Sequence, residues 1–305
     1  MSHVSFIIPA FNCATTLRET IASIYEGNVS EGDEVLIVDD ASTDSTADII
    51  RQLKEERSDI KSISHRYNRG GGAARNTAVE NAAHQVLFCL DSDNILAPNS
   101  VPRLHRFLVE TGADVAAFQE LHYFVDSPSQ VTHKWIFKPG QTTLADYVGG
   151  SIVPGASGNY LFTRDSWLRA RGYPEFAGAL DAWGFGLRQV GTGQKMVTMP
   201  SSHYFHRYGH ESYWVREAKP GKTSLIALQL LIPFIEQIRS QDVEYIMGPF
   251  GRLTWFDNID KRPLRLKTGE RGVTGIRKGF AAGSTPTLGI ARRFMSSLVR
   301  RLGGR

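Results

Sequence analysis

The sequence predicts an α/β fold in which a doubly wound, mostly parallel sheet carries helices on both faces. Short apolar runs alternate with segments of helical periodicity through the first hundred residues, as in parallel sheets whose strands are joined by crossover helices. The apolar runs are continuous, which is typical of strands buried on both faces. Acidic residues follow several runs directly, at the strand ends where open α/β sheets bind ligands.

The elements of the first hundred residues follow a regular order. Continuous apolar runs predict the strands, and apolar residues three or four apart predict the helices between them. Right-handed crossovers would place the carboxyl ends of these strands at one edge of the sheet. The predicted strands are 4–9, 34–38, 60–63 and 86–90, with apolar helix faces at 17–25, 47–53 and 78–82 between them.

The pattern is less regular after residue 97, and residues 126–150 carry no clear periodicity. A glycine-rich loop at 155–158 leads into a short predicted strand, and Pro233 divides the last predicted helix. The other predicted elements are helices at 98–109, 167–171 and 223–237, a strand at 115–118, an extended stretch at 121–125 and a strand at 195–199.

Composition bounds the class of protein. A length of 305 residues with 41% hydrophobic and 22% charged residues is ordinary for a globular chain with a sizeable core. Two cysteines make no disulfide framework, which favours a reducing compartment. We expect a cytoplasmic protein, because neither a signal peptide nor an apolar run of membrane-spanning length is recognisable.

Basic residues concentrate at the C-terminal end. Residues 261–305 hold 12 Lys and Arg against one acid, a charge of +11, so the net charge of +4 leaves −7 for the rest. We therefore predict a globular unit at 1–245, with a nucleotide-binding half (1–100) and an acceptor-binding half (101–245), and a basic helical extension at 246–305. Apolar residues at helical spacing between arginines in 290–302 suit an amphipathic helix on the inner, anionic face of a membrane. A helix docked on its own domain and a solvated tail are the alternatives. No nucleic-acid partner is expected.

Asp91 and Asp93 follow the strand at 86–90 directly. Aspartate is a poor strand residue and adds nothing to a core. Two hard oxygen donors at a strand's carboxyl end suit a divalent cation that also binds phosphate oxygens. The alternative is a turn that both acids merely cap.

Other polar residues converge on the same predicted edge. Three glycines at 70–72 open a helix, and their N–H groups with Arg75 could form an anion site, although a flexible loop is the alternative. Together with the acid pair, this pattern indicates a bound nucleoside diphosphate. The residues predicted to meet at this edge are Pro9, Asp39, Asp40, Arg75, Asp91 and Asp93.

Four motifs in order resemble those of family 2 glycosyltransferases, which have the GT-A fold. They are Val4–Asn12, Leu36–Asp44, Asn68–Asn76 and Asp91-Ser-Asp93. The resemblance implies inverting transfer of a sugar from a nucleotide-sugar donor, UDP-linked by family precedent, with Mn²⁺ or Mg²⁺ on the diphosphate. Saccharide, lipid-linked or polymer acceptors are all compatible with it.

The resemblance also implies roles for individual residues at this edge. Pro9 and Asp39 would border the nucleoside, and Arg75 would lie near the base or the diphosphate. Asp91 would lie near the ribose, and Asp93 would bind the metal.

The chemistry requires a carboxylate on the acceptor side, because the attacking hydroxyl must lose its proton. The family carries an acidic pair at the head of a helix in the corresponding region. Here Leu180 replaces the first acid, and Asp181 remains as the predicted general base. A helix N-cap is the alternative role for Asp181.

Three histidines occur in Ser201–Trp214, a segment that resembles the histidine-rich stretch of the family, where one histidine can complete the metal shell. We rank His206 first as the ligand, then His203 and His210. A packed or surface histidine is the alternative. Nearby Tyr204, Tyr208 and Trp214 could line an acceptor groove or belong to the core.

Three other functions compete with this one. A sugar nucleotidyltransferase should have a glycine-rich basic loop after the first strand, and a nicotinamide-binding enzyme should have Gly-x-Gly-x-x-Gly there. This chain has Pro-Ala-Phe-Asn at residues 9–12 instead. A binding module without catalysis remains open, because Leu180 stands where the family has an acid.

Overall fold

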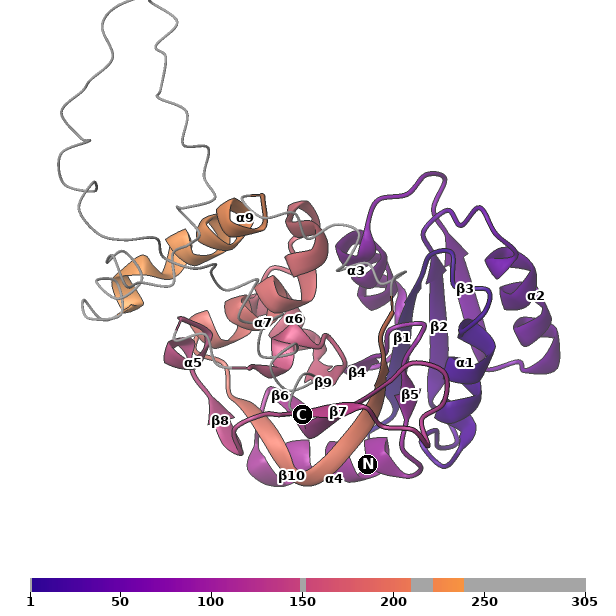
Figure 1. Cartoon of the computed structure of the whole chain (residues 1–305), viewed down its shortest axis with the longest axis horizontal. Helices are drawn as coiled ribbons and strands as arrows, with labels where there is room; N and C mark the ends of the chain where they lie inside the picture. Colours follow the sequence, from indigo (N-terminus) through magenta and orange to yellow (C-terminus); the bar gives the residue numbers. More distant parts are fainter. Residues whose placement is uncertain (1, 149–151, 210–221, 239–305) are drawn as a thin grey trace, which may run out of the picture.

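The computed structural model describes residues 2–148, 152–209 and 222–238, and their centre is a ten-stranded sheet (Figure 1). Strands β3, β2, β1 and β4 are parallel neighbours, as are β6 and β10, whereas β9 runs antiparallel between β4 and β6. The predicted α/β class with a mostly parallel sheet is therefore confirmed.

The sheet has one long path and two side strands. Strands β7 (His133–Ile136) and β8 (Gly140–Thr142) pair with β6 and β10, respectively. The order along the path is β3 (Ile60–Ser64), β2 (Glu34–Asp39), β1 (Val4–Ala10), β4 (Val86–Cys89), β9 (Tyr160–Thr163), β6 (Val115–Phe124), β10 (Met196–Arg207) and β5 (Ile95–Leu96).

Helices cover both faces, and each face has its own apolar core. On one face the core includes side chains of α1 (Leu17–Tyr25), α2 (Thr46–Glu56) and α4 (Ser100–Thr111). On the other it includes side chains of α3 (Gly71–Asn81), α5 (Leu144–Val148), α7 (Asp181–Gly191) and α9 (Lys222–Leu231). Short elements complete the described chain: η1 (Pro154–Ala156), α6 (Arg164–Arg169), η2 (Glu175–Leu180) and η3 (Ile232–Gln237).

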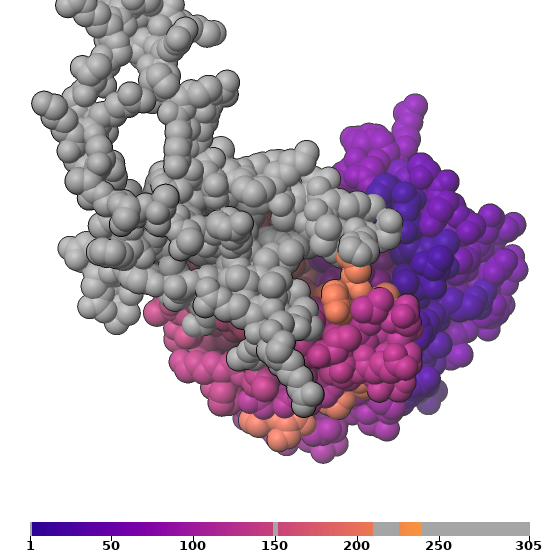
Figure 2. All heavy atoms as spheres, in the orientation of Figure 1, coloured from indigo at the N-terminus to yellow at the C-terminus, as the bar shows by residue number. Residues whose placement is uncertain are grey.

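The first hundred residues and the described residues that follow them occupy different sides of the molecule. Residues of the first hundred gather on one side, and residues beyond them on the other (Figure 2). The sheet nevertheless runs through both sides, because β9 joins β4 to β6. The predicted unit boundaries at 100 and 245 stay predictions.

Several second-half elements differ from the sequence prediction. Strand β6 is one continuous strand where a strand and a separate extended stretch were expected, and β10 continues to Arg207, which places His203 and His206 on a strand. Strands β7 and β8 and helix α5 fall in the region without clear periodicity. These elements are only three to five residues long, which is too short for apolar periodicity to be recognised.

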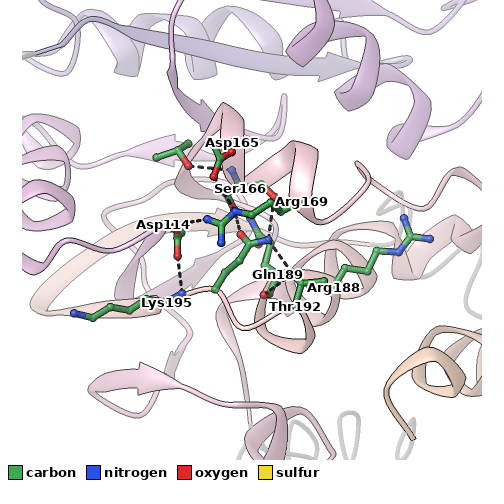
Figure 3. A network of polar contacts seen from close by, with 10 residues as sticks. Asp114, Asp165, Ser166, Arg169, Arg188, Gln189, Thr192 and Lys195 are labelled. Atoms are coloured by element: carbon green, nitrogen blue, oxygen red, sulfur yellow. Dashed lines mark hydrogen bonds and ion pairs between the residues drawn. The ribbon is translucent and has the colours of Figure 1, made fainter. Parts of the chain in front are cut away.

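A polar network holds α7 against its neighbours (Figure 3). Gln189 of α7 donates from Nε2 to Oγ of Ser166 in α6 at 2.8 Å. Arg169 of α6 pairs with Asp114, and Asp114 accepts the backbone N–H of Lys195 at 2.8 Å. The helix that begins with Asp181 is therefore fixed to α6, and α6 is fixed to the chain before β6 and β10.

Two predictions fall on parts of the chain outside the described residues: the basic extension at 246–305 and His210. Within the described part, no helix combines the length and apolar character needed to cross a membrane.

Glu34 ties three strands together at the sheet edge opposite the predicted site. Its carboxylate accepts hydrogen bonds from Ser5 Oγ at 2.7 Å, from Lys61 Nζ at 2.7 Å and from the backbone N–H of Ala83. Burial alone would raise the pKa of Glu34, but these bonds outweigh it and lower the pKa below its usual value.

We expect Glu34→Gln to lower the free energy of unfolding at pH 7 by about 1.5–3 kcal/mol, because charge-assisted hydrogen bonds are lost. A depressed folded pKa stabilises the protein above the unfolded pKa of about 4.3, and this contribution disappears as the pH falls through the folded pKa. Urea unfolding at pH 7 and pH 3 measures the difference. Exposed Glu56→Gln is the control, and a Glu34→Gln deficit that persists undiminished at pH 3 contradicts the assignment.

Candidate active site

The carboxyl ends of β1, β2 and β4 lie at one edge of the sheet, as predicted. Ala10 at the end of β1 is in register with Asp39 at the end of β2, and Leu90 after β4 donates its N–H to Ile7 of β1. Pro9 is the residue before Ala10 in β1. The structure therefore brings Pro9, Asp39 and the segment that begins at Asp91 together.

Asp91 is held on both carboxylate oxygens. Its Oδ1 is 2.5 Å from Arg75, and its Oδ2 accepts a hydrogen bond from Asn159 Nδ2 at 3.0 Å. Asn159 Oδ1 also accepts a hydrogen bond from the backbone N–H of Asp91 at 2.7 Å, so one amide side chain binds both the backbone and the carboxylate of Asp91. Asn159 is only 1% exposed. It belongs to the loop before β9, and the sequence analysis missed it.

Arg75 links Asp91 to Asp181. One terminal nitrogen of the guanidinium contacts Asp91, and the other donates to Asp181 Oδ2 at 2.7 Å. Arg75 is 8% exposed and Asp181 is 4% exposed, so the contact between them is almost fully desolvated, whereas the Asp91 side chain is 23% exposed. The first residue of α7 is thereby fixed to the end of β4.

The glycine loop gives part of its backbone donors to a carboxylate of the protein itself. The N–H groups of Arg69 and Gly70 donate to Asp40 at 2.9 and 2.7 Å, and His65 Nδ1 lies 2.6 Å from the same carboxylate. Asp40 is buried, and both its carboxylate oxygens accept hydrogen bonds within the protein. Its contact with the donor and the anion site at the glycines stay predictions.

Positions 71 and 72 have no room for a side chain, because α7 begins against them. A Cβ at Gly71 would lie 2.8 Å from an Arg75 terminal nitrogen and 3.0 Å from Asp181 Oδ2. A Cβ at Gly72 would lie 3.3 Å from Asp181 Cβ. The glycines therefore make room for the ion pairs. Each terminal nitrogen of Arg75 makes one ionic contact inside the protein and carries a second N–H group, so its contact with a diphosphate stays a prediction.

Asp93 differs from Asp91 in having a carboxylate to which no other described residue donates a hydrogen bond. Burial and the nearby charge of Asp91 raise the pKa of Asp93 to about 7. Asp93 is nonetheless partly accessible. An accessible, unpaired carboxylate with a raised pKa gains stability by binding a cation.

The histidines lie on opposite faces of β10. His203 stacks on His122 with ring centres 4.1 Å apart. His206 lies on the other face, where its Nδ1 is 3.2 Å from the hydroxyl of Tyr204, which in turn contacts Asn159. Burial lowers the pKa of His206 to about 4, so the ring is neutral at pH 7 and keeps a lone pair for a metal.

The donor set fits a divalent cation that takes most of its ligands from a substrate. No group of three or more His, Cys, Asp or Glu side chains within the described ranges is placed to hold a metal alone. Mg²⁺ and similar ions commonly bind one or two carboxylates plus substrate phosphates. Asp93 supplies such a carboxylate, and His206 lies on the same side of the sheet as Asn159 and Asp91.

The comparisons with known proteins agree with this geometry. Residues 5–171, more than half of the chain, match the model of glycosyl transferase family 2. The chain belongs to this family.

A curated relative from Escherichia coli, the UDP-Glc:alpha-D-GlcNAc-diphosphoundecaprenol beta-1,3-glucosyltransferase WfaP, is 33% identical over 132 residues, 43% of this chain and 50% of that protein. The chain spans half or less of the first curated relatives that it matches.

Two solved structures share the fold. S. aureus TarS 1-349 in complex with UDP-GlcNAc aligns with a TM-score of 0.65 at 18% identity, covering 81% of this chain and 71% of that one. The mannosyltransferase PcManGT from Pyrobaculum calidifontis, in complex with GDP-Man and Mn²⁺, aligns with a TM-score of 0.59 at 18% identity, covering 99% and 81%. The GT-A fold predicted from the sequence is therefore confirmed.

We expect Arg75→Gln to cost about 3–5 kcal/mol of unfolding free energy, because it leaves the buried Asp181 and the half-buried Asp91 without their counter-charge. Arg18→Gln removes the exposed pair with Glu56 and should cost about 0–1 kcal/mol. Urea unfolding at pH 7 compares the two variants. Equal midpoint shifts would contradict the central role of Arg75.

Proposed function

We propose that this chain transfers a sugar, with inversion, from a nucleotide-sugar to a hydroxyl of a saccharide or lipid-linked acceptor of the cell envelope. The observation that carries the proposal is the unpaired carboxylate of Asp93 beside the fixed Asp91, at the strand edge of a family 2 chain. UDP is the proposed nucleotide, because WfaP uses UDP-Glc by name and the TarS structure holds UDP-GlcNAc.

The nucleoside would lie over the ends of β1 and β2, along Pro9 and Asp39. Asp39 lines a cavity of about 270 Å³ between α2 and β3 together with Ser62 and Ser64. Neither Asp91 nor Asp93 lines this cavity. It therefore supports Asp39 as a contact for the nucleoside end of the donor only.

Asp93, with His206 as the second candidate ligand, would hold Mn²⁺ or Mg²⁺. When bound, the ion would neutralise charge on the leaving diphosphate. Asp91 would meet the ribose, with its orientation fixed by Arg75 and Asn159.

Asp181 is the proposed general base for the acceptor hydroxyl. Burial raises its pKa even though Arg75 acts in the opposite direction, and a raised pKa strengthens a carboxylate base. Its Oδ2 is held by Arg75 and its Oδ1 by the N–H of Ala182 at 2.6 Å. Each oxygen keeps a second lone pair, so the acceptor hydroxyl needs access to a carboxylate that is 4% exposed. An arriving diphosphate that attracts Arg75 away from Asp181 is the proposed cause of that access.

A binding module without catalysis is the second candidate. The two hydrogen bonds of Asp181 and its exposure of only 4% favour this candidate. If Asp181 stays in this arrangement, its carboxylate serves only as a structural counter-charge for Arg75. Leu180 belongs to the apolar core and supplies no replacement acid.

We expect Asp181→Asn to lower kcat about 10²–10⁴-fold with little change in donor affinity, because it removes a base and not a binding contact. Asp93→Asn should instead weaken Mn²⁺-dependent donor binding. Single-turnover transfer and calorimetric titration with UDP-GlcNAc or UDP-Glc measure these effects.

Exposed Asp48→Asn is the matched control. If the wild-type protein binds a donor but neither transfers nor hydrolyses it across a panel of acceptors, the proposed enzymatic function is overturned and the binding module remains.

A further inference from the structure

The segment that carries Asp93 has its backbone fixed by side chains from two other elements. Thr16 Oγ1 donates to the carbonyl oxygen of Ser92 at 2.9 Å. Arg207 donates from Nε to the carbonyl oxygen of Asp93 at 3.2 Å, and its backbone N–H donates to Asn94 Oδ1 at 3.0 Å. Because no described residue donates to the Asp93 carboxylate, these backbone contacts set its position.

Arg207 is itself held at every nitrogen of its guanidinium. One terminal nitrogen donates to the carbonyl oxygen of Val125 at 2.9 Å, and the other pairs with Glu19 of α1. The guanidinium also lies over the ring of Phe124, 4.5 Å from its centre. The Arg207 side chain is 17% exposed and connects α1, the chain after β6 and the Asp93 segment.

The positive charge of Arg207 is balanced by Glu19. A lone guanidinium so close to a cation-binding carboxylate would repel the cation. Glu19 supplies the opposite charge at a terminal nitrogen of Arg207, so the Arg207 side chain stays fixed and adds little net charge. Arg207 directly follows His206 in β10, so two consecutive residues supply the imidazole ring and the guanidinium on either side of the strand.

We propose that Arg207, held by Glu19, is a positioning residue that fixes the Asp93 carboxylate for a divalent cation. The inference rests on the proposed metal-dependent function. Side chains that orient metal ligands from outside typically affect metal affinity about 10–100-fold. Lysine cannot replace arginine at this position, because its single nitrogen cannot reach Asp93, Val125 and Glu19 together.

The test uses Mn²⁺ with saturating UDP and detects free Mn²⁺ by electron paramagnetic resonance. We expect Arg207→Gln to weaken Mn²⁺ binding about 10-fold or more. Arg207→Lys and Glu19→Gln should give smaller losses. Binding of UDP without metal should change less than about 2-fold, since Arg207 contacts neither Pro9 nor Asp39.

Arg18→Gln is the matched control, because it breaks an exposed Arg–Glu pair between α1 and α2, next to Glu19 in the sequence. Urea unfolding of each variant identifies the folded fraction. If Arg207→Gln does not fold, Arg207→Lys and Glu19→Gln decide the question. Folded variants whose Mn²⁺ titrations coincide with the wild type overturn the inference alone. Wild-type protein that binds UDP but leaves all Mn²⁺ free overturns the inference together with the metal-dependent function.

Discussion

The structure depends on a buried guanidinium that joins two carboxylates from opposite sides of the site. Arg75 belongs to α3, Asp91 follows β4 in the first half of the chain, and Asp181 begins α7 in the second half. Desolvating charges costs several kcal/mol per ion, and the loss of Arg75 would leave both carboxylates without their counter-charge. The glycines at 71 and 72, the core position of Leu180 and the network that holds α7 all serve this arrangement.

Because Asp91 is engaged inside the protein and Asp93 is not, the two acids have different roles. Asp91 is fixed by Arg75 and Asn159, and through Asn159 and Tyr204 it is connected to His206. Asp93 receives only indirect support through its backbone. This difference suits the proposed donor, because the fixed Asp91 would meet the ribose while the unpaired Asp93 would hold the metal on the diphosphate.

The sequence was sufficient for the fold and for the convergence of the strand ends, because continuous apolar runs and crossover connections determine both. It was insufficient for the partners of each side chain. Asp40 and Arg75 look like ligand contacts in the sequence, yet each pairs with groups distant in sequence that local patterns cannot reveal. Asn159 and Arg207 carried no motif signal, because their burial and their partners are set by tertiary packing. The one local signal for Asn159 is its position after a glycine-rich loop. Strands β7 and β8 were missed because they are too short for apolar periodicity to be recognised.

The charges at this edge also bear on the proposed cation. Asp91, Asp93 and Asp181 contribute three potential negative charges, Arg75 contributes one positive charge, and Arg207 is balanced by Glu19. An anionic diphosphate approaching this edge would meet net negative charge and be repelled. Protonation of Asp93, whose pKa is raised to about 7, relieves the repulsion only in part. Under the proposed function, a divalent cation on Asp93 would remove the repulsion and attract the diphosphate. The same excess of acid that disfavours a free donor would then favour a donor that arrives with its metal.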